Sequence, residues 1–146
     1  MEFQQLAYAL LLAINLIHGV HSAVFTIRNN CPYSIAPATL TGGGAAASTT
    51  GFQLASGASN NINIPTPWTA CNGAGAKPPA TLAEFTIGGS GGKDFYDVSL
   101  VDGFNLPVSI VPNGGCARSD CPVDINARCP SQFALRNRAG AAIGCT

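Results

Sequence analysis

Apolar and polar residues alternate along much of this chain with the two-residue period of a β-strand. The segments that show this period are short, and glycine, proline or asparagine separates them. The predicted strands are residues 24–27, 34–40 (the weakest), 61–64, 81–87, 95–101 and 106–110. Turn sequences separate the last three strands: a glycine- and serine-rich stretch at 88–92 and the dipeptide Asp102-Gly103.

Helical periodicity is weak in comparison. After residue 22 no window of eleven or more positions has a convincing 3.6-residue period, and residues 131–138 come nearest. Many short strands between turns indicate an all-β protein, either a sandwich or a barrel. The length of 146 residues allows one domain at most.

Residues 1–22 have the pattern of a secretory signal peptide. Residues 6–17 form an apolar core that is too short to span a membrane. Val20 and Ser22 occupy the small-residue positions before a cleavage site that follows residue 22. The sequence therefore predicts a signal peptide at 1–22, one domain at 23–146, and a secreted protein without an integral membrane segment.

Charge and composition exclude several classes of function. Cleavage would remove Glu2 and both histidines, and would leave seven basic and six acidic residues, a net charge of 7 − 6 = +1. So few charges give no basic footprint for nucleic acid or anionic membranes. Without histidine, a Ser-His-Asp or Cys-His nucleophile and a His-ligated zinc site are excluded, and no cofactor or metal is expected. Any enzymatic chemistry would have to rest on carboxylates.

Six cysteines in a secreted chain predict a disulfide framework. Six cysteines can pair in many ways, and spacing alone does not select one of them. The chain has no Cys-x-x-Cys pair, which argues against a zinc site. The cysteines are Cys31, Cys71, Cys116, Cys121, Cys129 and Cys145.

Residues 77–111 hold four of the six acidic residues that would remain after cleavage: Glu84, Asp94, Asp97 and Asp102. Glycoside hydrolysis requires two carboxyl groups across the scissile bond, about 5–5.5 Å apart for retention or about 6.5–9.5 Å for inversion. Glu84 and Asp102 are candidates for this pair, with Asp97 as a neighbouring like charge. In the alternative interpretation, Asp102 merely belongs to a turn and Asp97 is an exposed strand residue.

Five stretches, taken together, are specific enough to suggest a family. They read AVFTIRNNCPY at 23–33, GASNNINIPTPW at 57–68, KPPATLAEF at 77–85, DFYDVSLVDGFNLP at 94–107 and DINARCP at 124–130. In this order they resemble the thaumatin-like, pathogenesis-related class 5 proteins of plants. The resemblance covers nearly all of the chain after residue 22, and it implies the β-sandwich core of that family.

The resemblance also implies that this sandwich is incomplete. The chain passes directly from Trp68 to Cys71 through two residues, where the family has a further strand and a cysteine-containing stretch. It stops at Thr146, near the start of the family's cysteine-rich second domain. We therefore expect a thaumatin-like domain that is shortened internally and at its C-terminus.

Matching the family's disulfides to this chain implies one complete bridge, Cys129–Cys145. The other four cysteines match positions whose partners fall in segments that this chain lacks. They would pair with one another, stay free, or link molecules into oligomers. Loss of one native disulfide from a small secreted domain costs roughly 2–5 kcal/mol. A non-functional truncated product is therefore one alternative for the whole chain.

The family is credited with an acidic cleft that binds fungal β-1,3-glucan. Glu84, Asp97 and Asp102 match its acidic residues, whereas the family's arginine and a further aspartate have no counterpart here. The resemblance thus implies an antifungal defence protein of the apoplast that binds β-1,3-glucan or a similar wall polysaccharide, with no catalytic residue assigned. The alternatives are a weak endo-β-1,3-glucanase and an inhibitor of microbial glycoside hydrolases such as xylanase.

Four aromatic residues are candidates for stacking on sugar rings: Trp68, Phe95, Tyr96 and Phe104. Aromatic side chains at strand spacing belong more often to the hydrophobic core. Phe95 in particular is predicted to be a core residue.

Overall fold

Antiparallel β-hairpins make up the regular structure of this chain. The computed structural model describes residues 22–40, 51–65 and 77–146. In these residues β1 pairs with β2, β3 with β4, β5 with β6 and β7 with β8, which gives four two-stranded sheets. The predicted all-β class is confirmed. The strands are β1 (Ser22–Arg28), β2 (Ser59–Pro65), β3 (Leu82–Thr86), β4 (Phe95–Ser99), β5 (Val108–Ile110), β6 (Ser119–Cys121), β7 (Ala134–Arg136) and β8 (Ala142–Cys145), with short 3₁₀ turns η1 (Ser90–Gly92) and η2 (Asn126–Arg128).

The β1–β2 hairpin forms one layer of the fold. Phe25 lies opposite Ile62 in the antiparallel register, and Ile64 follows on the same side because side chains alternate along a strand. Ile62 and Ile64 are almost fully buried. On the other side, the Thr26 hydroxyl donates a hydrogen bond of 2.8 Å to Asn61 Oδ1. The alternation in the sequence therefore separates a buried side of this hairpin from an exposed one.

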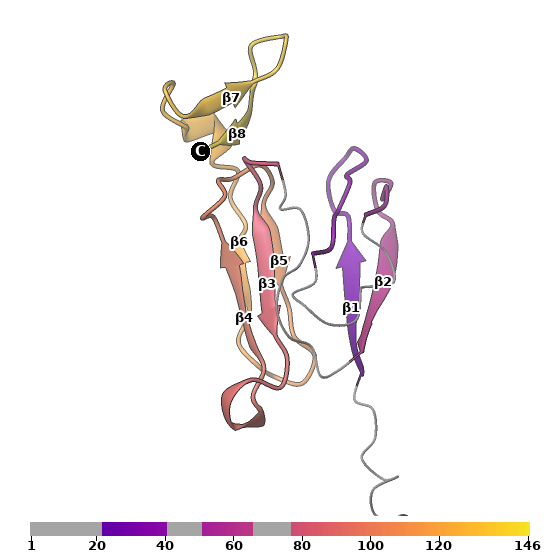
Figure 1. Ribbon diagram of the computed structural model, residues 1–146. Coiled ribbons are helices and arrows are strands. Elements are labelled where there is room, and N and C mark those ends of the chain that lie inside the picture. Colours follow the sequence, from indigo (N-terminus) through magenta and orange to yellow (C-terminus); the bar gives the residue numbers. More distant parts are fainter. Residues whose placement is uncertain (1–21, 41–50, 66–76) are drawn as a thin grey trace, which may run out of the picture.

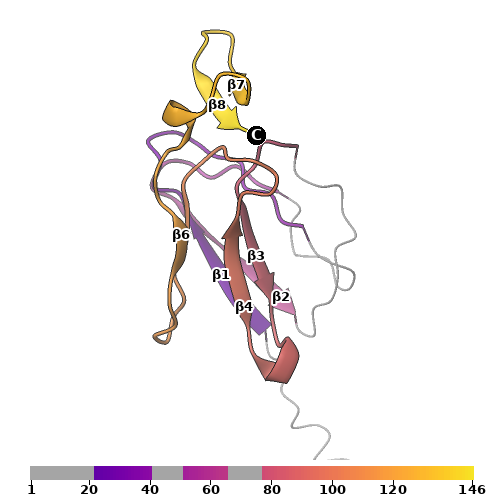
Figure 2. The same cartoon turned by 90° about the vertical axis from the view of Figure 1, so that its left-hand side faces the viewer.

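The β3–β4 and β5–β6 hairpins lie side by side and form the second layer (Figure 1). The N–H of Val98 in β4 donates a hydrogen bond of 3.2 Å to Ser119 Oγ in β6. The two layers meet where Phe25 of β1 contacts Phe85 of β3, with 4.4 Å between the ring centroids. Figure 2 shows the second layer in front of β1 and β2. The arrangement is a small two-layer β-sandwich, as predicted.

The β7–β8 hairpin lies at one end of the second layer and is attached there through Phe104 (Figure 1). Phe104 is 1% exposed. Its N–H and its carbonyl exchange hydrogen bonds of 2.7 and 2.8 Å with Cys145. Gly103 has a φ of +87°, and a Cβ at this position would lie 2.6 Å from the Cys145 carbonyl oxygen. We call this tightly packed region, formed by Pro79, Gly103, Phe104, Gly144 and Cys145, the β8 junction.

Asn29 determines where β1 ends. It is 1% exposed, and its side-chain amide donates hydrogen bonds of 2.8 and 2.9 Å to the carbonyls of Tyr33 and Leu54. Its Oδ1 accepts a hydrogen bond of 2.9 Å from the N–H of Cys31. Asparagine favours such turns because its side chain can bond to the backbone two residues later. The first predicted strand, residues 24–27, lies within β1, which ends at Arg28 directly before Asn29.

The remaining predictions about the fold concern residues 34–40, the signal peptide and membrane-spanning segments. Residues 34–40 form no strand, contrary to prediction: they contribute only the isolated bridges Ile35–Leu54 and Ala38–Gly51. The predicted signal peptide lies outside the described residues except for Ser22, with which β1 begins. Among the described residues, no helix has the length and apolar character needed to cross a membrane.

Candidate functional site

Glu84 and Asp97 lie directly opposite each other on β3 and β4. They are partners in the antiparallel register, and both residues are exposed. The neighbouring pair, Phe85 and Tyr96, points to the other side, because Phe85 packs against Phe25 of the first layer. The two carboxylates therefore point away from the first layer. We call this side of the hairpin, formed by Glu84, Thr86, Phe95 and Asp97, the outer face of β3–β4.

The two carboxylates on this face have no counter-charge among the residues that the structure describes. No hydrogen bond or ion pair reaches either of them from the other described residues. Facing partners on an antiparallel pair have Cβ atoms about 4.5–5.5 Å apart, and like charges at that distance destabilise the hairpin. Proteins break such local rules mainly where a function requires it. No group of three or more potential metal ligands gathers here or elsewhere in the described residues.

Asp102 lies beyond one end of this pair. It belongs to the turn after β4, where its carbonyl accepts a hydrogen bond of 2.9 Å from the N–H of Ala80. Ala80 precedes Glu84 by four residues, which is about 13 Å along an extended strand. The residue opposite Glu84 is thus Asp97 and not Asp102. The exposed strand position of Asp97 and the turn position of Asp102 also satisfy the alternative interpretation of these residues.

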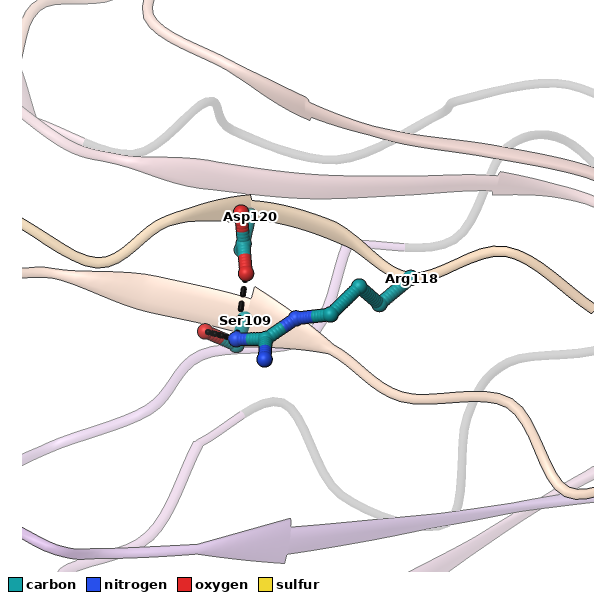
Figure 3. Close-up of polar contacts among 3 residues, drawn as sticks. All are labelled: Ser109, Arg118 and Asp120. Carbon is teal, nitrogen blue, oxygen red and sulfur yellow. Dashed lines mark hydrogen bonds and ion pairs between the residues drawn. The ribbon is translucent and has the colours of Figure 1, made fainter.

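A second polar group lies on the neighbouring hairpin (Figure 3). Arg118 forms an ion pair with Asp120 of β6, and its guanidinium donates a hydrogen bond of 3.5 Å to Ser109 Oγ of β5. Ser109 and Asp120 are opposite each other in the register. This guanidinium is therefore engaged on its own hairpin and leaves the charges of Glu84 and Asp97 unpaired. The sequence pattern did not predict this group, although Arg118 and Asp120 have the two-residue spacing that places strand residues on one side.

Among the candidate aromatic residues, Phe95 is not in the core, contrary to prediction. It is 51% exposed and lies on the outer face with Asp97, opposite Thr86. Phe104 is buried. Tyr96 points to the other side of β4, and its hydroxyl donates a hydrogen bond to the carbonyl of Ala117. Trp68 lies outside the described residues.

A disulfide joins Cys129 and Cys145, with 5.7 Å between their Cα atoms. This is the pair that the resemblance implies. Cys116 is exposed, and Cys31 and Cys121 are partly buried; all three are free thiols. Cys116 and Cys121, the latter in β6, are therefore not joined to each other in this fold. Cys71 lies outside the described residues.

Comparison with known proteins identifies the family. Residues 69–146 match the thaumatin family. "Thaumatin-like protein 1" of Pyrus pyrifolia is 40% identical over 178 aligned positions, which include 99% of this chain and 73% of that protein. The chain belongs to the thaumatin family. The alignment has 178 positions, whereas this thaumatin-like chain has 146 residues. Within the aligned region the relative therefore has residues for which this chain has no counterpart.

Two further relatives bear on function. A protein of Prunus avium named "Glucan endo-1,3-beta-glucosidase" is 43% identical over 87% of this chain and 65% of its own length. "Pathogenesis-related protein 5" of Arabidopsis thaliana is 40% identical over 82% of this chain and 62% of its own length. The thaumatin-like chain thus has relatives among pathogenesis-related proteins and among proteins named for an activity on β-1,3-glucan.

Proposed function

We propose that this thaumatin-like chain is a secreted plant defence protein of the apoplast that binds β-1,3-glucan, or a similar fungal wall polysaccharide, through the outer face of β3–β4. The observation that carries the proposal is the exposed, unneutralised pair Glu84 and Asp97 in direct register. Ionised carboxylates accept several hydrogen bonds each, which suits them to the hydroxyl groups of a sugar. The name of the Prunus avium relative supports β-1,3-glucan as the polysaccharide.

The direct test is binding of the secreted protein to insoluble β-1,3-glucan in a pull-down. The double variant Glu84→Gln/Asp97→Asn keeps the size of both side chains and removes both charges, and we expect it to lose most of the binding. Its control is Asp120→Asn/Asp124→Asn, which changes the net charge equally and lies outside this face. Asp124 accepts a hydrogen bond from a backbone N–H, which an asparagine oxygen can also accept, and Asp120 pairs with Arg118 on the neighbouring hairpin. Equal binding by the two double variants would contradict the proposal.

Asp102 is assigned a smaller part in this proposal. It is partly buried at the end of the hairpin, where it can contact only a ligand that extends along β3 from Glu84 toward Ala80. Asp102→Asn is therefore expected to weaken the binding of long glucans more than that of short ones. If Asp102→Asn weakens the binding of long and short glucans equally, Asp102 contacts the ligand next to Glu84 and Asp97 instead.

A second candidate function is weak endo-β-1,3-glucanase activity. The facing carboxylates and the name of the Prunus avium relative favour it. The general acid of a glycosidase is usually a carboxyl group in an apolar, buried environment, whereas Glu84 and Asp97 are exposed, so the geometry suits binding better. Release of reducing sugar from laminarin that disappears in Glu84→Gln would establish the activity. Release that persists in this variant would assign it to a contaminant.

A further inference from the structure

Phe95 is an exposed aromatic side chain that the core does not use. It is 51% exposed, although burial of an aromatic ring in the core is strongly favourable. It precedes Asp97 by two residues on β4, so both side chains lie on the outer face. An apolar ring thus lies on the same surface as two carboxylates that have no partner in the described part of the chain.

The ring also lies against the turn that carries Gly89. Thr86 is its partner across the hairpin, and a Cβ on Gly89 would lie 3.1 Å from both Cδ2 and Cε2 of the ring. The turn that carries Gly89 is held by hydrogen bonds of 2.8 Å between the Gly89 N–H and the Lys93 carbonyl and of 2.8 Å between the Gly88 N–H and Asp94 Oδ1. Phe95 therefore presents a ring whose movement this turn restricts before any ligand binds, which lowers the entropy cost of binding.

We infer that Phe95 is a stacking platform for one pyranose unit of a bound glucan, next to the unit that Glu84 and Asp97 hold by hydrogen bonds. This inference rests on the proposed function. Small-ligand sites commonly combine an apolar or aromatic surface with a few polar groups that fix orientation. A pyranose ring in the β-configuration offers both kinds of contact, because its C–H groups form an apolar face and its hydroxyls lie around the rim.

The spacing along β4 determines the size of the ligand. Two residues on one side of a strand are about 7 Å apart, so Phe95 and Asp97 cannot both make their best contacts with a single sugar ring. The site therefore selects oligosaccharides over glucose. It also gives the ligand a direction, with the chain running along the β3–β4 hairpin from the Gly89 turn toward Asp102.

The experiment is calorimetric titration of the secreted protein with laminaripentaose and with glucose. Phe95→Leu keeps an apolar side chain but removes the ring, and we expect its Kd for laminaripentaose to rise about tenfold, the value of one aromatic contact. Phe95→Tyr keeps the ring and should bind like the wild type. The matched control is Phe133→Leu, since Phe133 is also about half exposed, at 48%, but belongs to the β7–β8 end of the molecule.

The outcomes separate this inference from the function on which it rests. If the wild type does not bind laminaripentaose, the proposed function fails. If the wild type binds and Phe95→Leu binds equally well, the function stands and the stacking role of Phe95 is wrong. If Phe95→Tyr is weakened as much as Phe95→Leu, the ring itself is not what matters, which also contradicts the inference. Circular dichroism of each variant shows whether it is folded.

A second measurement does not depend on loss of affinity. In Phe95→Trp, a sugar stacked on the indole should change its fluorescence during titration with laminaripentaose, beyond any change in the wild type, whose tryptophan is Trp68. An identical response in the two proteins would overturn the stacking role.

Discussion

The β8 junction, at one end of the second layer, and the outer face of β3–β4, on one side of that layer, differ in burial and in hydrogen bonding. At the β8 junction, Phe104 is buried, and its backbone exchanges two hydrogen bonds with Cys145. On the outer face, Glu84 and Asp97 are exposed and have no partner among the described residues. The first region stabilises the fold, and the second weakens it slightly. Substitutions in the first region should therefore change mainly stability, and substitutions in the second should change mainly binding.

Phe104→Ala should have the largest effect on stability. Truncation of a buried phenylalanine removes its burial energy and leaves a cavity, which costs about 3–5 kcal/mol. We expect this loss in the free energy of unfolding measured with urea. Phe133→Ala is the matched control, because Phe133 is 48% exposed, and it should change stability far less. Similar losses in the two variants would contradict the description of the β8 junction.

Removal of the disulfide should have the second-largest effect on stability. Cys129 and Cys145 are 16 residues apart, and a loop of that size is worth about 3 kcal/mol in the chain-entropy description. The double variant Cys129→Ser/Cys145→Ser should lose about this amount in a urea titration. Cys116→Ser, which replaces an exposed free thiol, should lose little. A large loss in Cys116→Ser would show that Cys116 is paired after all.

Gly103→Ala should lower the stability of the protein clearly more than Gly114→Ala does. Both glycines have a positive φ, which costs alanine about 1–2 kcal/mol. A Cβ at Gly103 would in addition come within 2.6 Å of a backbone oxygen and 2.8 Å of the Pro79 side chain, whereas a Cβ at Gly114 would meet nothing within 4 Å. The difference between their melting temperatures isolates this close contact. Equal melting temperatures would mean that the β8 junction can make room for the added methyl group without a loss of stability.

The smallest effect on stability is expected on the outer face, and with the opposite sign. Asp97→Asn removes one of two facing like charges, so it should stabilise the protein by a few tenths of a kcal/mol while it weakens glucan binding. Asp120→Asn breaks the ion pair with Arg118 and should destabilise slightly or not at all. Thermal unfolding at low salt gives the largest contrast, because salt screens both effects. Destabilisation by Asp97→Asn would show that its carboxylate has a partner.

The sequence predicted best those strands in which apolar and polar residues alternate clearly. β1, β2, β3, β4 and β5 all fall within or over predicted segments. β6 contains a cysteine, β8 contains a cysteine and a glycine, and β7 is only Ala-Leu-Arg, so none of the three shows a clear alternation. Residues 34–40 alternate weakly but make only isolated bridges. Short strands in this fold form because the hairpins beside them hold them in place, and a local pattern does not contain that information.

The candidate site was predictable in part. Glu84 and Asp97 could be named from the family motif, but their direct register depends on the length of the turn between β3 and β4. The side on which Phe95 lies was available from its spacing to Asp97, since two residues on a strand share a side. The prediction for Phe95 was wrong because it followed the general tendency of aromatic residues rather than this spacing. The Arg118–Asp120 pair shows the same two-residue spacing.

The most direct test of the whole account is a titration of ¹⁵N-labelled protein with laminaripentaose, followed by the backbone amide shifts. We expect the shifts to concentrate on β3 and β4, at Glu84, Thr86, Phe95 and Asp97, and the amide signals of Phe104 and Cys145 to stay unchanged. Shifts centred on the β7–β8 hairpin, or shifts spread evenly over the molecule, would contradict the division between a binding face and a stabilising junction.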